Sequence, residues 1–137
     1  MLFRSRVDWT VFWRRLSVAV RESAHLTHAF EPVQDLFVDR APWQAWLDRY
    51  QQRLDEQGRD AQARQTTGER MLRTNPKFVL RNHLAETAIR HAQVGDFAEI
   101  DQLLHLLQSP FDEHPGMDAW ADFPPDWAGQ LEISCSS

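Results

Sequence analysis

Apolar side chains recur at intervals of three and four through most of the sequence, which is the spacing of one face of an α-helix. Asp8 can cap a first helix, whose apolar face is formed by Trp9, Phe12, Trp13, Leu16 and Val20. A second helix is predicted from about Pro42 to Gly58, with a stripe of Trp43, Trp46, Leu47, Tyr50 and Leu54. Because aromatic residues at helical spacing are usually buried, both stripes are expected to form core. The alternative is that part of this aromatic face docks on another domain, since exposed apolar patches mark interfaces. The polar stretch 60–73 is expected to be a solvent-facing helix.

A helical hairpin is predicted over residues 76–108. Asn75 precedes Pro76, and this pair is typical of a capping residue followed by proline in the first turn. Gly95 is suited to end the first helix in the left-handed conformation, and Asp96 to cap the second. Ser109 and Pro110 should stop that second helix. The short connection predicts two antiparallel helices.

Residues 110–137 follow a different pattern, with four prolines and no helical period. We interpret them as an extended tail that ends in a mobile cysteine, Cys135. The predicted fold is therefore all-α, with about four to six helices in a domain over 1–109 and a proline-rich tail over 110–137.

Composition narrows the class of protein. The chain has 137 residues, 42% of them apolar, which fits one globular domain. Residues 1–90 hold all fifteen Lys and Arg against eleven acids (+4), and 91–137 hold nine acids and no Lys or Arg (−9), which gives the net charge of −5. The acidic part either meets a basic surface or is an unevenly charged solvated surface. An acidic chain without a base-reading motif does not support nucleic-acid binding.

The sequence favours a cytoplasmic protein. No run of about 18 apolar residues is present, so no segment is expected to span a membrane. The first residues lack the apolar stretch of a secretory signal. A single cysteine, Cys135, fits a reducing compartment, since it cannot form an internal disulfide.

Catalytic signatures are missing from the sequence. There is no glycine-rich phosphate loop, no HExxH and no paired CxxC, so no catalytic, cofactor-binding or metal-binding residue is predicted in this chain. Lys77, the only lysine, is read as a solvated helix residue. Four histidines, taken as surface or capping residues, leave a weaker metal or cofactor site open: His25, His28, His83 and His91. Cys135, near the end and between serines, is either a passenger or an accessible redox thiol.

Several segments resemble a known family, among them Phe37-Val38-Asp39-Arg40 and Trp46-Leu47-Asp48-Arg49-Tyr50. The run from Asn75 to Ala85, followed by Ala88-Ile89 and Gly95-Asp96, is similar to the carboxy-terminal region of selenoprotein O and its bacterial relatives. So is the end of the chain, Pro124-Pro125-Asp126-Trp127-Ala128 and then Leu131 to Ser137. The similarity extends over nearly the whole chain from about residue 8, and the terminal motif is its most specific part.

The resemblance implies a protein adenylyltransferase of the transferase class. Such enzymes have a kinase-like (pseudokinase) fold, bind ATP with magnesium or manganese, and transfer AMP to hydroxyl side chains of proteins. The family's nucleotide- and metal-binding residues precede this region, so none maps onto this chain. The implied partners are the kinase-like core of the same protein and the protein substrates of the full-length enzyme.

One functional residue carries over by resemblance. The family places selenocysteine, or cysteine in bacteria, third from the end, where Cys135 stands, and this residue is thought to make activity redox-sensitive. The chain is then expected to support the kinase-like core and to supply Cys135. The alternative is a free-standing, non-catalytic helical interaction module, in which an exposed docking face would favour self-association.

Overall fold

The computed structural model describes residues 7–125. Over these residues the chain forms six α-helices and one 3-10 helix without any strand, which confirms the all-α prediction. The chain divides into two compact units, Met1–Asn75 and Pro76–Ser137, and each is described by itself. The domain boundary predicted at residue 109 stays a prediction, and Cys135 lies outside the described residues.

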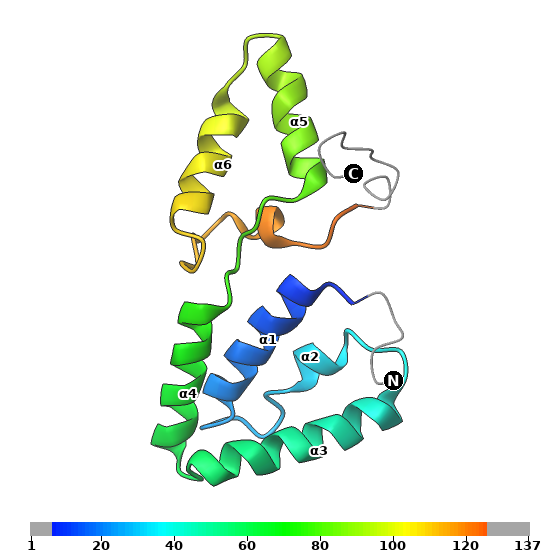
Figure 1. Cartoon of the computed structure of the whole chain (residues 1–137), viewed down its shortest axis with the longest axis vertical. Coiled ribbons are helices and arrows are strands. Elements are labelled where there is room, and N and C mark those ends of the chain that lie inside the picture. The colour runs from blue at the N-terminus through cyan, green and yellow to red at the C-terminus, as the bar shows by residue number, and fades with distance from the viewer. Residues whose placement is uncertain (1–6, 126–137) are drawn as a thin grey trace. The chain divides into compact units, whose positions relative to one another are not determined.

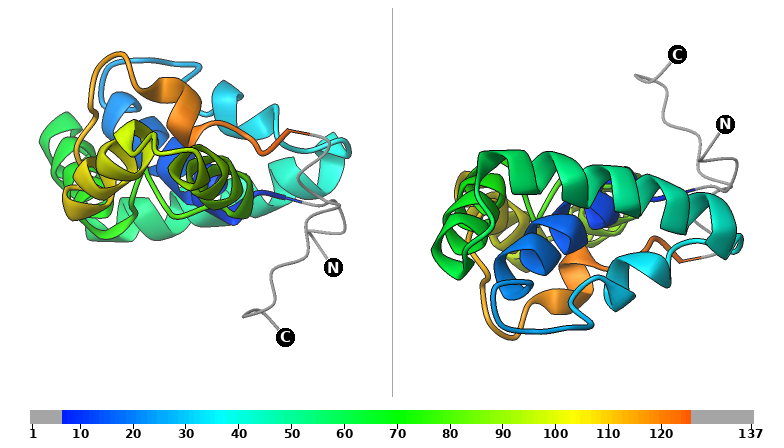
Figure 2. Two further views of the ribbon diagram at one scale, coloured as in Figure 1. Left: turned by 90° about the horizontal axis from the view of Figure 1, so that it is seen from above. Right: turned by 90° about the horizontal axis from the view of Figure 1, so that it is seen from below.

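The first unit contains four helices: α1 (Trp9–Glu22), α2 (Glu31–Gln34), α3 (Arg40–Gln57) and α4 (Ala61–Thr74). Helix α1 packs against α4 and against α2, and Figures 1 and 2 show α3 passing across the same group. The predicted caps are confirmed, since Asp8 accepts a hydrogen bond from the Val11 N–H and α3 ends at Gly58. Asp39 caps α3, which therefore begins two residues before Pro42.

The core of this unit lies between α1, α2 and α3. Its buried members are Phe12, Leu16, Ala19, Val20, Val33, Phe37, Trp43, Leu47 and Leu54. Four rings stack in series: Phe37 on Trp43, Trp43 on Trp46, and Trp46 on Tyr50, with centroids 5.0, 5.5 and 4.9 Å apart. Stacked aromatic pairs add about 0.5–1.5 kcal/mol each beyond their buried area.

Part of the predicted aromatic core is exposed. Trp9 and Trp13 are 44% and 41% accessible, so the expectation that this whole stripe is core was wrong for them. Phe12, which belongs to the same stripe, is fully buried in the core of the unit. The two indoles lie edge-on to its ring, at 5.4 and 4.9 Å between centroids, and leave their outer surfaces uncovered.

Among the helices that the structure describes, α4 and α1 form the most extensive contact, although the sequence of α4 is mostly polar. Gly68 explains the close approach, because it is buried and a Cβ added to it would fall on the backbone of Arg21. The prediction of a helix at this place is confirmed, but one side of it is packed rather than solvent-facing. Because glycine has no side chain, α4 can approach α1 closely at Gly68. For the same reason, this packed position gives no hydrophobic signal in the sequence.

A polar network completes the contact between α1 and α4. Arg14 is buried, and its Nη1 donates to the carbonyls of Leu72 and Asn75 at 3.1 and 3.0 Å. The Asn75 amide donates to Ser17 Oγ at 3.1 Å and to the Met71 carbonyl. A cation at the carboxyl end of a helix satisfies carbonyls that lack intrahelical partners and complements the helix dipole.

The second unit contains α5 (Asn82–Gln93), α6 (Ala98–Gln108) and the 3-10 helix η1 (Asp118–Ala121). Figure 1 shows α5 and α6 as the two arms of a hairpin. Gly95 adopts φ +87° in the connection, as predicted. The predicted cap at Asp96 was wrong by one residue, since Phe97 is the N-cap of α6, although the Asp96 carboxylate accepts from the Ala98 N–H at 3.1 Å. The second helix stops at Ser109, also as predicted.

The predicted helix start at Pro76 was wrong by six residues. Asn75 caps the end of α4 instead of opening a helix, and α5 begins at Asn82. The N–H groups of Lys77 and Phe78 donate to the Pro110 carbonyl at 2.9 and 3.2 Å. This partner lies far along the chain, so local sequence gave no sign of it.

Candidate functional site

The tail that leads toward Cys135 is held to the second unit at its beginning. Lys77 Nζ lies 2.9 Å from Glu113 Oε2 and 2.7 Å from Asp118 Oδ1, and it also donates to the Glu113 carbonyl. The lysine side chain is only 15% exposed. It is therefore an anchor between the chain before α5 and the chain after α6, and the reading of Lys77 as a solvated helix residue was wrong.

The environment of Lys77 raises the pKa of its ammonium above the usual value. Burial alone would lower this pKa, but the hydrogen bonds that the ammonium donates to Asp118 and Glu113, and the charges of both carboxylates, outweigh that effect. The ammonium also lies 5.4 Å from the centre of the Phe78 ring. It therefore stays charged at neutral pH and serves the tail as a fixed cation.

His114 forms a second contact at the start of the tail. Its Nε2 lies 2.8 Å from the Ser109 carbonyl, and its ring meets Phe78 and His105 edge-on at 5.2 Å between centroids. The backbone of His114 has φ +46°, which is unusual for a residue other than glycine. Side-chain and backbone contacts thus fix the course of the chain just after α6.

The four histidines of the weaker metal hypothesis lie in separate environments. His25 and His28 are exposed, and His28 pairs with Glu31 at 3.4 Å. His83 is buried, and burial, with a smaller contribution from the charge of Arg81, lowers its pKa. His91 Nδ1 lies 2.8 Å from Glu99. Within residues 7–125, no group of three His, Cys, Asp or Glu side chains could hold a metal ion.

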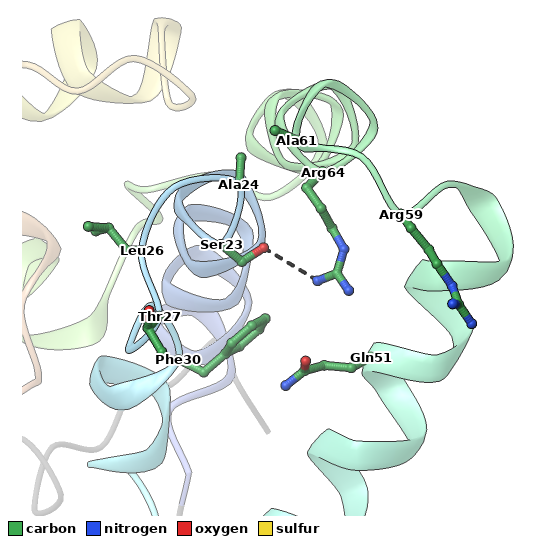
Figure 3. A pocket seen from close by; sticks show the side chains of 9 residues that line it. All are labelled: Ser23, Ala24, Leu26, Thr27, Phe30, Gln51, Arg59, Ala61 and Arg64. Atoms are coloured by element: carbon green, nitrogen blue, oxygen red, sulfur yellow. Dashed lines mark hydrogen bonds between the residues drawn. The ribbon is translucent and has the colours of Figure 1, made fainter.

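A cavity of about 260 Å³ opens in the first unit, between the end of α1, the second half of α3 and the start of α4. Figure 3 shows the Arg64 guanidinium, the Gln51 amide and the Phe30 ring pointing into a common space, while Arg59 turns away from it. The guanidinium lies 2.7 Å from Asp55 and donates to Ser23 Oγ at 3.4 Å.

The polar groups that line this cavity are suited to hydrogen bonding. Because the carboxylate of Asp55 already neutralises Arg64, the cavity carries little net attraction for a free anion. Gln51 and Ser23 add polar groups beside the Phe30 ring. The cavity can accommodate a small polar group. The sequence does not reveal it, because its lining combines residues of α3 and α4 with residues of the α1–α2 and α3–α4 connections.

None of the described helices is long and apolar enough to cross a membrane. By fold, residues 7–125 form a small all-helical protein region of two units.

Comparison with known proteins assigns this region to a family. The family model described as "Protein adenylyltransferase SelO" matches residues 1–108. The protein nucleotidyltransferase YdiU of Albidiferax ferrireducens is 53% identical over 139 residues, which cover all of this chain and 26% of the relative. Its counterpart from Cupriavidus metallidurans is 51% identical over 138 residues, covering all of this chain and 24% of the relative.

The chain therefore belongs to the protein adenylyltransferase SelO family, as the resemblance predicted. It spans about a quarter of the length of the curated relatives it matches.

Proposed function

We propose that this chain is the carboxy-terminal helical part of a protein adenylyltransferase, and that it supports the kinase-like core instead of performing AMP transfer. The observation that carries the proposal is that about half of the aligned residues, over the whole chain, are identical to those of proteins named protein nucleotidyltransferase. The chain covers only about a quarter of them, so the nucleotide chemistry is assigned to the rest of the enzyme. ATP and magnesium or manganese would then bind to the part of the enzyme outside this chain. The proposed location of the enzyme is the cytoplasm.

A chimera tests this proposal. In it, the 137-residue chain replaces the matched quarter of the Albidiferax ferrireducens relative. We expect the chimera to transfer AMP from labelled ATP to protein acceptors at a rate within about tenfold of the unmodified relative. A folded chimera that transfers no AMP would contradict the proposal and would favour a free-standing interaction module.

Cys135 is proposed as a redox-sensitive residue of the full-length enzyme. The support is the terminal motif and the anchoring of the tail at Lys77, which gives the segment before Cys135 a fixed origin. Two thiolates that form a disulfide give up two electrons to an oxidant, so the proposed partner is a second cysteine outside this chain. We expect Cys135→Ser to remove the effect of mild oxidant on AMP transfer by the chimera. Equal oxidant sensitivity in the variant and the parent would exclude this role.

A further inference from the structure

Helix α6 is apolar on two sides. Leu103 and Leu106 are buried within the second unit. The N-cap residue Phe97, with Ile100 and Leu104 of the helix, lies at spacings of three and four on another side, and these three are 57%, 39% and 54% exposed. We call these three residues the α6 stripe. Exposed apolar residues that line up in this way are typical of an interface, whereas single exposed apolar residues are ordinary.

The chain that contains and follows the α6 stripe carries one sign of charge along its sequence. In α5, which packs against α6, Arg90 is paired with Glu86. From His91 to Pro125 every Asp, Glu, Lys or Arg is acidic, seven residues in all. Asp96 and Asp101 are exposed next to the stripe, whereas Glu99 pairs with His91. Lys77 neutralises only Glu113 and Asp118, farther along the chain. A surface that covers the stripe would therefore gain from a basic rim around an apolar centre.

We propose that the α6 stripe docks on a basic-rimmed apolar surface in the part of the full-length enzyme that this chain does not span. This inference rests on the proposed function, and it names the face through which the helical region meets the core. Two observations favour this occupant. About three quarters of the relatives' length lies outside the matched region. The acidic surroundings would repel a second copy of the same face.

Hydroxyl-radical footprinting of single side chains tests the docking. Phe97, Ile100 and Leu104 should be oxidised readily in the 137-residue chain and at least about fivefold more slowly in the chimera described above. Equal reactivity in both proteins would overturn the inference. So would slow oxidation in the chain alone accompanied by dimer mass in light scattering, because the occupant would then be a second copy.

Variants separate docking from its alternatives. Leu104→Asp in the chimera should restore fast oxidation of Phe97, and Asp101→Lys should do so partly, because a reversed charge meets the basic rim. Val38→Asp is the matched control, since Val38 is exposed in the first unit, and it should leave Phe97 protected. Protection that survives Leu104→Asp would contradict the docking.

The two hypotheses fail in different ways. A chimera that protects the stripe but transfers no AMP would remove the proposed function and leave the docking intact. A chimera that transfers AMP with the stripe fully reactive would remove the docking and leave the proposed function.

Discussion

The two units of the chain bury their apolar residues to different degrees. Over residues 7–75, the first has nine buried apolar residues, a stacked aromatic series and a polar network between α1 and α4. The described part of the second, residues 76–125, buries four apolar residues (Phe78, Ala88, Leu103 and Leu106) and exposes a larger set along its helices and loops, among them Leu80, Ile89, Val94, Phe97, Ile100, Leu104 and Phe111.

This difference suggests a division of roles. The first unit buries its apolar residues among its own helices, whereas the second leaves more of them exposed. On the docking proposal, the second unit depends more on its anchored tail and on the surface that covers these exposed residues. Such exposed apolar residues are expected in a region of a larger enzyme when the rest of the polypeptide packs against one of its faces. Substitutions should therefore affect the first unit most when they disturb packing, and the second when they disturb charge.

The largest effect is expected from Gly68→Ala. The new methyl group would fall on the backbone of Arg21, which cannot move aside as a flexible side chain can, so α4 must separate from α1. We expect a loss of about 3 kcal/mol or more in the free energy of unfolding, measured with urea. Gly95→Ala is the matched control, because a Cβ there meets no atom and only its positive φ costs about 1 kcal/mol. Equal losses for the two variants would contradict the close packing of α4.

A smaller effect is expected from Lys77→Met, which keeps the aliphatic stem and removes the charge. Its two carboxylate partners are largely exposed, so we expect a loss of about 1 kcal/mol confined to the anchored segment. Hydrogen exchange at the Met117 and Trp120 amides, both bonded within that segment, should accelerate. Lys77→Arg should preserve most of the protection, and unchanged exchange in Lys77→Met would rule out the anchor.

The Lys77 anchor also predicts a dependence on pH. The folded pKa lies above the ordinary value of 10.5, so the folded state binds its proton more tightly than the unfolded state does. The contribution to stability is therefore complete below 10.5 and is lost as the pH rises through the raised folded pKa. Exchange at Met117, corrected for its intrinsic pH dependence, should rise in that alkaline window in the parent and not in Lys77→Met.

The smallest effect is expected at His83. Burial, and then the charge of Arg81, lowers its pKa below 6.5, so the folded state binds fewer protons than the unfolded state. Stability of the second unit should be complete above pH 6.5 and should fall as the pH drops through the lowered folded pKa. Protection of α5 amides against exchange should show this slope, and His83→Gln should flatten it. His28→Gln, at an exposed position, should leave the slope unchanged; a slope that persists in His83→Gln would assign it to another group.

Local signals in the sequence predicted much of the fold. Asp8, Gly58 and Gly95 mark helix ends through their own backbone or side-chain chemistry, and the structure confirms them. The start of α5 could not be predicted, because Asn75 and Lys77 take partners from α1 and from the chain after α6.

Helix packing and ion pairs were harder to predict from the sequence than helix ends. Gly68 has no side chain to reveal a buried face, and nothing in the sequence around Arg14 indicates that it lies buried against the end of α4. Lys77 was noticed as the only lysine, but its two carboxylate partners lie 36 and 41 residues away. The one predicted site residue, Cys135, falls outside the described residues and stays a prediction.

On the proposed function, these helices support the chemistry of a protein adenylyltransferase without performing it. The most direct measurement is AMP transfer by the 137-residue chain alone, with ATP and magnesium or manganese and a protein acceptor, read by mass spectrometry of the acceptor beside the chimera as positive control. The proposed function predicts AMP adducts with the chimera and none with the chain alone. AMP adducts formed by the isolated chain, above a control without protein, would contradict it.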